Sequence, residues 1–119
     1  LNDDSIMKFN VSCDKQFQLT PEISLLRTRG HTPGHLSIKI ESDGEVGIVI
    51  GALMPTRCHA MCACHVGNDT HSLEGSIYKM QYLEQAVADG WTIFLEHDVS
   101  CAGTATKDEK GRFTYKPIE

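Results

Sequence analysis

Two histidines stand on either side of a Thr-Pro-Gly turn in the first third of the chain, in the order Gly-His-Thr-Pro-Gly-His. A histidine on a rigid turn between two strands has a fixed orientation, and the imidazole nitrogen is a common zinc ligand. The first of the pair, His31, is therefore a candidate metal ligand. The second, His35, is expected to support the turn through hydrogen bonds rather than to bind a metal itself.

A third histidine follows the short apolar run at residues 92–95, in the order Glu-His-Asp. Such a run predicts a buried strand, so His97 would stand where that strand ends. The neighbouring carboxylate of Asp98 could accept a hydrogen bond from the ring of His97 and orient it, or Asp98 could simply be a turn residue. Asp69, with His71, could line the pocket, but a solvated loop is the preferred expectation.

One short segment combines thiols and imidazoles, the residue types that suit zinc or copper. Its members are Cys58, His59, Cys62, Cys64 and His65. Their spacing matches no common zinc module, because such modules use separated pairs of cysteines. Two interpretations stay open: a small metal-binding loop, or a loop beside an active site in which the cysteines pack as small apolar groups. If a metal binds this chain, His59 could fold back toward His31 and His97.

The elements that must position these residues can be predicted from periodicity and turn residues. Strands are expected at residues 23–28, 35–41 and 46–50, with an Asp-Gly hairpin turn between the last two. The third of these runs is apolar throughout, which predicts burial on both faces. A long irregular segment follows, and then a helix at about residues 73–88.

The helix is expected to bury the apolar positions that recur at helical spacing, and to end at a glycine. Its predicted buried positions are Ile77, Met80, Leu83 and Val87, and Gly90 is the expected stop. Trp91 and Phe94, beside the next strand, are expected in the core. A last strand is predicted at residues 112–115.

The fold class predicted from this order is α+β, with one sheet and one main helix. The whole chain, residues 1–119, is expected to form a single domain, with residues 1–20 as an irregular lead-in. One helix cannot cover both faces of a sheet of about five strands, so the sequence indicates one half of a larger layered sandwich.

Taken together, the histidine turn, the apolar strand that ends in Gly51-Ala52, the helix and the late Glu-His-Asp resemble the C-terminal half of a metallo-β-lactamase-fold hydrolase of the lactonase or glyoxalase type. The resemblance covers roughly residues 20–119. It implies an αββα sandwich in which two metal ions, zinc or another divalent transition metal, lie between two sheets. The metals would activate a water molecule that attacks an ester, lactone or thioester bond.

The resemblance also implies a set of ligands, of which this chain has a part. His31 and His97 match the positions of two C-terminal ligands. The position of the aspartate that bridges the metals is Ala52, whose methyl group cannot bind a metal. The His-x-His-x-Asp-His loop of the N-terminal half does not occur in the sequence. The chain is therefore expected to bind no metal on its own unless the site is completed.

Three functional hypotheses follow. The first is a metal-dependent hydrolase fragment or subunit, inactive alone, that depends on another chain or segment for the missing N-terminal half. The second is a non-catalytic structural or assembly module derived from that fold, and the third is a small metal-binding module built on the cysteine and histidine segment. Ser37 has no base at a spacing typical of a nucleophile, and the cysteines lack basic neighbours in the sequence, so no catalytic residue is assigned.

Composition narrows the class of partner. The net charge of −5 argues against a nucleic-acid partner, and no apolar stretch approaches the roughly 20 residues of a membrane span. The odd count of five cysteines and the lack of a visible signal peptide favour reduced thiols and a cytoplasmic location. Because half of a sandwich leaves an apolar sheet face open, a homo-oligomer or a complex with the chain that supplies the other half is expected.

Overall fold

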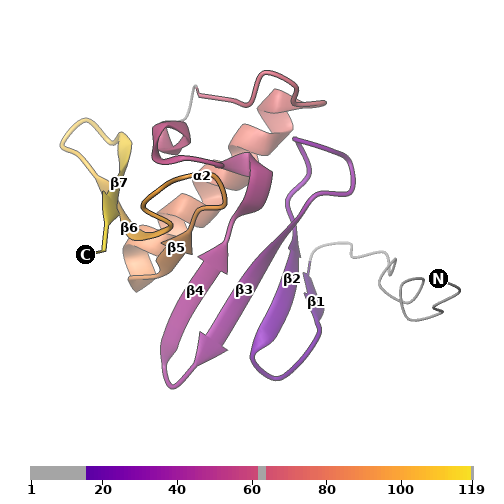
Figure 1. The fold of residues 1–119 in the computed structure, drawn as a ribbon, viewed down its shortest axis with the longest axis vertical. Coiled ribbons are helices and arrows are strands. Elements are labelled where there is room, and N and C mark those ends of the chain that lie inside the picture. The colour runs from indigo at the N-terminus through magenta and orange to yellow at the C-terminus, as the bar shows by residue number, and fades with distance from the viewer. Residues whose placement is uncertain (1–15, 62–63, 119) are drawn as a thin grey trace, which may run out of the picture.

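A computed structural model describes residues 16–61 and 64–118. These residues form one sheet of seven strands in sequential order, with one long helix (Figure 1). The strands are β1 (Gln16–Gln18), β2 (Ile23–Arg27), β3 (Leu36–Ser42), β4 (Glu45–Val49), β5 (Thr92–Phe94), β6 (Ala102–Lys107) and β7 (Phe113–Pro117). The helix is α2 (Ser72–Asp89), and two short 3-10 turns, η1 (Gly51–Leu53) and η2 (Arg57–Ala60), precede it. Strand β1 lies inside the expected irregular lead-in.

The direction of the strands decides which loops meet. Neighbouring strands are antiparallel except for β4 and β5, which are parallel and joined through α2. Since β2 is antiparallel to β3, and β3 to β4, the strands β2, β4 and β5 all run the same way. Their C-terminal ends therefore share one edge of the sheet, and the residues that follow them include His31, Ala52 and His97. We call this the histidine edge.

The hairpin between β3 and β4 forms as the sequence predicts. Asp43 and Gly44 both have positive φ, at 52° and 78°. A two-residue turn with both central residues in this region matches the twist of the flanking strands, which is why Asp-Gly is a strong hairpin signal.

The helix begins and ends close to the predicted residues, but its buried face differs from the prediction. Gly90 stops α2 in the left-handed conformation, with φ 68°, as expected. Leu83 is buried and Val87 packs against the core, whereas Ile77 is 60% exposed and Met80 is 38% exposed. The buried positions are Gly75, Ser76, Lys79, Leu83 and Ala86.

Two contacts explain this rotation of the helix. Gly75 lies directly against the backbone of Gly30, so close that a Cβ on Gly30 would come within 2.2 Å of the Gly75 Cα. Lys79 is 1% exposed because its ammonium group donates hydrogen bonds to the carbonyl oxygens of Met61, at 3.0 Å, and Cys64, at 2.7 Å. Apolar periodicity carries no information on either contact, so the prediction placed the wrong stripe inward.

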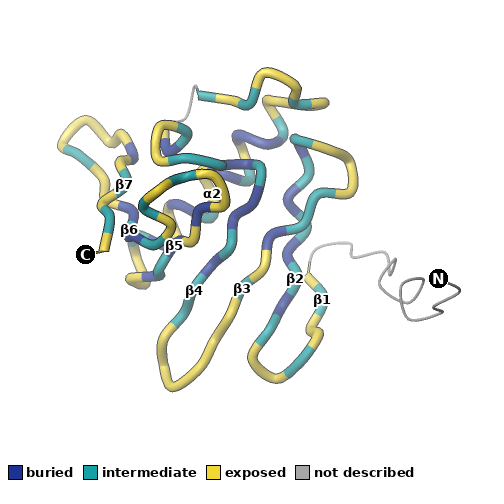
Figure 2. Tube along the Cα trace, viewed as in Figure 1, coloured by how far each residue is buried: buried dark blue, intermediate teal, exposed yellow. Residues whose placement is uncertain are grey.

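The core lies between α2 and one face of the sheet. It includes Ile48, Ile50, Ile93 and Trp91 from the sheet side and Leu83 and Ala86 from the helix. The prediction that the third strand is buried on both faces is wrong, since Ile48 is buried while Val49 is only partly covered. Figure 2 shows that β4 changes between exposed, intermediate and buried along its length. Phe94 was also expected in the core but is 37% exposed.

The second face of the sheet, opposite α2, is here called the open face. Because side chains alternate along a strand, the residues between the core positions point to it. The strand register aligns Phe17, Leu25, Ile38, Val49, Phe94 and Ala102 in one row across six strands. No helix in the described ranges lies over this row (Figure 1). Nor does any helix in those ranges have the length and apolar character that a membrane crossing requires.

Candidate functional site

His31 is held at the histidine edge by a carboxylate that is distant in sequence. Its Nδ1 lies 2.9 Å from Oδ1 of Asp69, whose side chain is only 7% exposed. The backbone N–H of Thr70 donates to the carbonyl oxygen of His31, and that of His71 donates to Gly30. This hydrogen bond occupies Nδ1, so Nε2 is the ring nitrogen that Asp69 does not contact. The expectation that Asp69 sits in a solvated loop is therefore wrong.

His35 uses both of its ring nitrogens in hydrogen bonds within the protein. Its Nδ1 lies 3.0 Å from the carbonyl oxygen of Thr28, and its Nε2 accepts a 3.0 Å hydrogen bond from the backbone N–H of Ala52. This pattern assigns the proton to Nδ1 of a neutral ring. Burial lowers the pKa of His35 below its ordinary value, against the opposing effect of the Thr28 hydrogen bond. His35 thus ties the end of β2 to the segment that follows β4.

The segment after β4 is shaped to receive this ring. Gly51 has φ 71°, and a Cβ there would lie 2.8 Å from Nε2 of His35, so glycine is required both for the conformation and for the space. Ala52 follows, and its amide is the donor to His35. The position that the resemblance assigns to a bridging carboxylate therefore contributes a backbone N–H to the edge and no metal ligand.

His97 stands at the same edge, but no carboxylate among residues 16–61 and 64–118 is hydrogen-bonded to its ring. Its backbone N–H donates a 3.1 Å hydrogen bond to the carbonyl oxygen of Pro55, which links the end of β5 to the segment after β4. The side chain of His97 is exposed.

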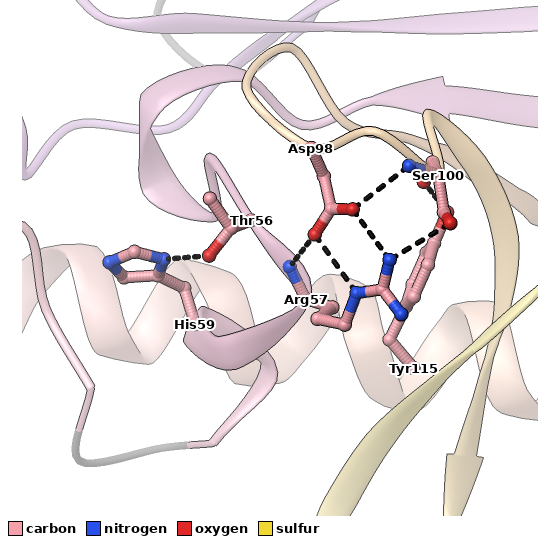
Figure 3. Close-up of polar contacts among 6 residues, drawn as sticks. All are labelled: Thr56, Arg57, His59, Asp98, Ser100 and Tyr115. Carbon is pink, nitrogen blue, oxygen red and sulfur yellow. Dashed lines mark hydrogen bonds and ion pairs between the residues drawn. The ribbon is translucent and has the colours of Figure 1, made fainter.

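Asp98 takes a different partner from the one expected. Its carboxylate accepts hydrogen bonds from the backbone N–H, Nε and Nη2 of Arg57, at 2.9, 3.2 and 2.8 Å, and from the N–H of Ser100 (Figure 3). The Arg57 side chain beside it holds the pKa of Asp98 far below its usual range. All the contacts of this carboxylate within the described residues go to Arg57 and Ser100, so the expected contact with the ring of His97 is absent there.

The same network fixes the loop between β5 and β6. Arg57 Nη2 also donates to the Ser100 hydroxyl at 2.8 Å, and the Tyr115 hydroxyl donates to the Ser100 carbonyl oxygen at 2.8 Å (Figure 3). Burial raises the pKa of the Tyr115 phenol. The network therefore joins η2, the β5–β6 loop and β7, and it holds the backbone beside His97 in place.

The cysteine and histidine segment is anchored by protein groups. His59 Nδ1 lies 2.9 Å from the Thr56 hydroxyl, and His65 Nδ1 lies 3.0 Å from the Ser76 hydroxyl. Cys58 and Cys64 are free thiols, the first exposed and the second partly buried. Cys62 lies outside the described residues. Lys79 and Ser76, one turn apart on α2, thus hold both ends of residues 61–65.

The side chains present do not fit a metal ion. Within residues 16–61 and 64–118, no three His, Cys, Asp or Glu side chains converge to hold one. A catalytic zinc needs three protein ligands, and the edge offers two imidazoles and an alanine. The donor set of the described residues therefore falls short of the metal centre that the resemblance implies.

Comparison with known proteins bears on the fold. No family model matches the sequence, and no curated protein matches it. Among solved structures, a probable metal-dependent hydrolase from Staphylococcus aureus is similar, with a TM-score of 0.77 and 23% identity over 92% of this chain. This chain has part of the metallo-β-lactamase fold. The finding confirms the predicted resemblance and the predicted α+β class.

Two further structures with this fold show the same relation. The hydrolase AbOPH of the β-lactamase superfamily gives a TM-score of 0.75 at 19% identity over 84% of this chain, and the dizinc quorum-quenching lactonase AidC gives 0.71 at 19% identity over 90%. The chain spans 40%, 35% and 37% of the three neighbours' own lengths. The metallo-β-lactamase fold is thus present in part, as expected for a C-terminal portion.

Proposed function

We propose that this chain is part of a metal-dependent hydrolase of the metallo-β-lactamase type, for ester, lactone or thioester bonds, and that it has no activity alone. The observation that carries the proposal is the histidine edge. The parallel course of β2, β4 and β5 brings the segments of His31, Ala52 and His97 to one side of the sheet. The neighbours with this fold are metal-dependent hydrolases and lactonases.

The contacts of His31 support this assignment. A carboxylate that holds one ring nitrogen of a histidine fixes the orientation of the ring and leaves the other nitrogen as the donor. Asp69 occupies that position on Nδ1 of His31. The remaining donors would come from a segment or a chain that carries the rest of the fold, and the metal would be zinc or another divalent transition ion.

A non-catalytic assembly module is the second candidate, and a specific observation favours it. The amide of Ala52 is occupied by His35, and the carboxylate of Asp98 is occupied by Arg57. The edge is therefore stabilised by hydrogen bonds that need no metal. In this alternative the fold is kept for its surfaces and His31 serves the turn alone.

Restoring a carboxylate at Ala52 distinguishes the two. We expect Ala52→Asp to raise the zinc retained after dialysis. The new carboxylate would add a metal ligand at the edge that carries the imidazole of His31, whose orientation Asp69 already sets. Adding His31→Ala should abolish the gain. The matched control is Ala88→Asp, an exposed position on α2. A gain equal to that of the control would reject the hydrolase proposal and leave the assembly module.

A further inference from the structure

Two buried hydroxyl groups lie next to His35, and neither belongs to the candidate ligands. Thr28, directly after β2, and Ser37, on β3, both have 0% of their surface exposed. Their hydroxyl oxygens lie 2.9 Å apart, and the Thr28 hydroxyl also lies 2.9 Å from Nδ1 of His35. A buried hydroxyl group destabilises the fold unless it is hydrogen-bonded, so both side chains need these partners.

The direction of each hydrogen bond in this group follows from its two backbone ends. Ser37 Oγ lies 2.9 Å from the carbonyl oxygen of Ile50, which can only accept, so Ser37 donates its one proton there. Ser37 therefore accepts from the Thr28 hydroxyl, and Thr28 accepts from Nδ1–H of His35. At the other end, Nε2 of His35 accepts from the backbone N–H of Ala52. Each proton in the group thus has one assigned position.

These hydrogen bonds close a cycle, because their two backbone ends, Ile50 and Ala52, are separated only by Gly51. We call it the buried hydrogen-bond cycle, and its three side chains are Thr28, His35 and Ser37. It contacts the backbone on both sides of Gly51, where the chain turns with φ 71°. Hydrogen bonds that all run in one direction polarise one another, so the loss of one member weakens the others.

The same proton directions exclude a nucleophilic role for Ser37. A serine nucleophile gives its proton to a base, whereas Ser37 donates to the carbonyl oxygen of Ile50. His35 stands at the donor end of the cycle and takes no proton from either hydroxyl. Full burial also separates the Ser37 hydroxyl from any substrate. The cycle therefore acts on the backbone.

We propose that Thr28 and Ser37 are positioning residues, which act through His35 to fix the backbone of residues 50–52 at the histidine edge. This segment includes Ala52, the position that the resemblance assigns to a bridging carboxylate. The importance of the cycle for a metal site rests on the proposed function, whereas the cycle itself needs no metal.

Hydrogen exchange of the Ala52 amide, followed by NMR in buffer with a chelator, tests the proposal. Thr28→Val keeps the shape of the side chain and removes its hydroxyl, and Ser37→Ala removes the second hydroxyl. Each variant should speed the exchange of the Ala52 amide by roughly tenfold or more relative to that of Ile48, in the middle of β4. Thr28→Ser restores the hydroxyl and should restore the slow exchange.

The comparison with Ile48 separates positioning from a general loss of stability. A purely structural role would speed the exchange of both amides together, because both would then report the same global unfolding. An unchanged ratio of the two rates in Thr28→Val and in Ser37→Ala would overturn the proposal. The two variants remove different members of one cycle, so either one that folds is sufficient. The matched control is Ser42→Ala, an exposed position on β3, and it should leave the ratio unchanged.

Zinc retention distinguishes this proposal from the proposed function. In the Ala52→Asp chain, adding Thr28→Val should lower the zinc gain, and adding Thr28→Ser should keep it. A gain that Thr28→Val leaves unchanged would contradict the positioning role. Absence of any gain in Ala52→Asp alone would reject the hydrolase proposal, and the exchange rates of the Ala52 amide would still decide whether Thr28 and Ser37 fix this segment.

Discussion

His31 and His97 stand at the same edge of the sheet, but the protein holds them in different ways. The ring of His31 is held by Asp69, which is 38 residues away in sequence. His97 has a carboxylate next to it in sequence, yet Asp98 binds Arg57 and fixes the loop backbone instead. The difference teaches that an acid beside a histidine in sequence says little about its partner in space, since Asp98 lies in the loop after β5 and pairs with Arg57, 41 residues away.

Among the changes considered for the histidine edge, a substitution in the turn that carries His31 should lower the free energy of unfolding most. We expect Gly30→Ala to destabilise the fold by about 3 kcal/mol or more, because the new Cβ would collide with the backbone of Gly75 and Gly30 has φ 150°. Urea denaturation gives the free energy of unfolding. Gly34→Ala, in the same turn with nothing within 4 Å of the new Cβ, is the control and should change little.

The next largest loss of stability is expected for a substitution of His35, which connects the end of β2 to the segment after β4. His35→Ala leaves the amide of Ala52 and the carbonyl of Thr28 unpaired, and we expect a loss of about 2 to 3 kcal/mol. His71→Ala removes an exposed ring from the neighbouring segment and serves as the control. A loss no larger than that of the control would mean that the His35 contacts are not needed.

Because the pKa of His35 is lowered in the folded protein, His35 should make the stability of the fold depend on pH. Because the folded state disfavours the protonated ring, the unfolded chain binds more protons as the pH falls below about 6.5, and stability decreases there. Thermal unfolding of the wild type from neutral to mildly acidic pH should show this loss. His35→Gln should flatten the slope between pH 7 and the lower pKa of the folded state, roughly as expected for one titrating group.

Asp69→Asn should have a smaller effect. The amide keeps the shape of the carboxylate but removes the acceptor charge beside Nδ1 of His31, so a loss of about 1 kcal/mol is expected. Asp89→Asn, exposed at the end of α2, is the control for the change in net charge. Nitrogen NMR of the His31 ring provides the decisive readout, because the wild type should hold the proton on Nδ1 and the variant should mix the two tautomers.

Asp98→Asn should have the smallest effect on stability, because Arg57 is exposed and solvent screens the ion pair. Because the pKa of Asp98 is lowered in the folded protein, its contribution to stability depends on pH in a defined direction. The contribution is fully present above the ordinary aspartate pKa of about 4 and disappears only at still lower pH. The melting temperatures of variant and wild type should therefore differ at neutral pH and converge in strong acid. A difference that vanishes between pH 7 and 5 would contradict this assignment.

The sequence predicted most elements better than their contacts. Alternation, the Asp-Gly turn and Gly90 are local signals, and they predicted β2, β3, β4, β5 and β7, the hairpin and the end of α2. Strands β1 and β6 were not predicted, so the sheet has seven strands rather than about five. The inward stripe of α2 was predicted wrongly because Lys79 is buried through carbonyl oxygens of a distant loop. No local signal reports such a contact.

The candidate site shows the same limit. The motif around His31 identified the edge, and the resemblance supplied the positions of Ala52 and His97. The partners of the acidic residues could not be predicted, because Asp69 reaches His31 and Asp98 reaches Arg57 across 38 and 41 residues. The roles of His31 and His97 as metal ligands stay predictions.

The central claim is that the edge positions two histidines without completing a metal centre. The zinc content of the purified wild-type chain after dialysis tests it most directly. The account predicts far less than one zinc per chain, with no decrease in His31→Ala. One zinc per chain that is lost in His31→Ala or His97→Ala would contradict it.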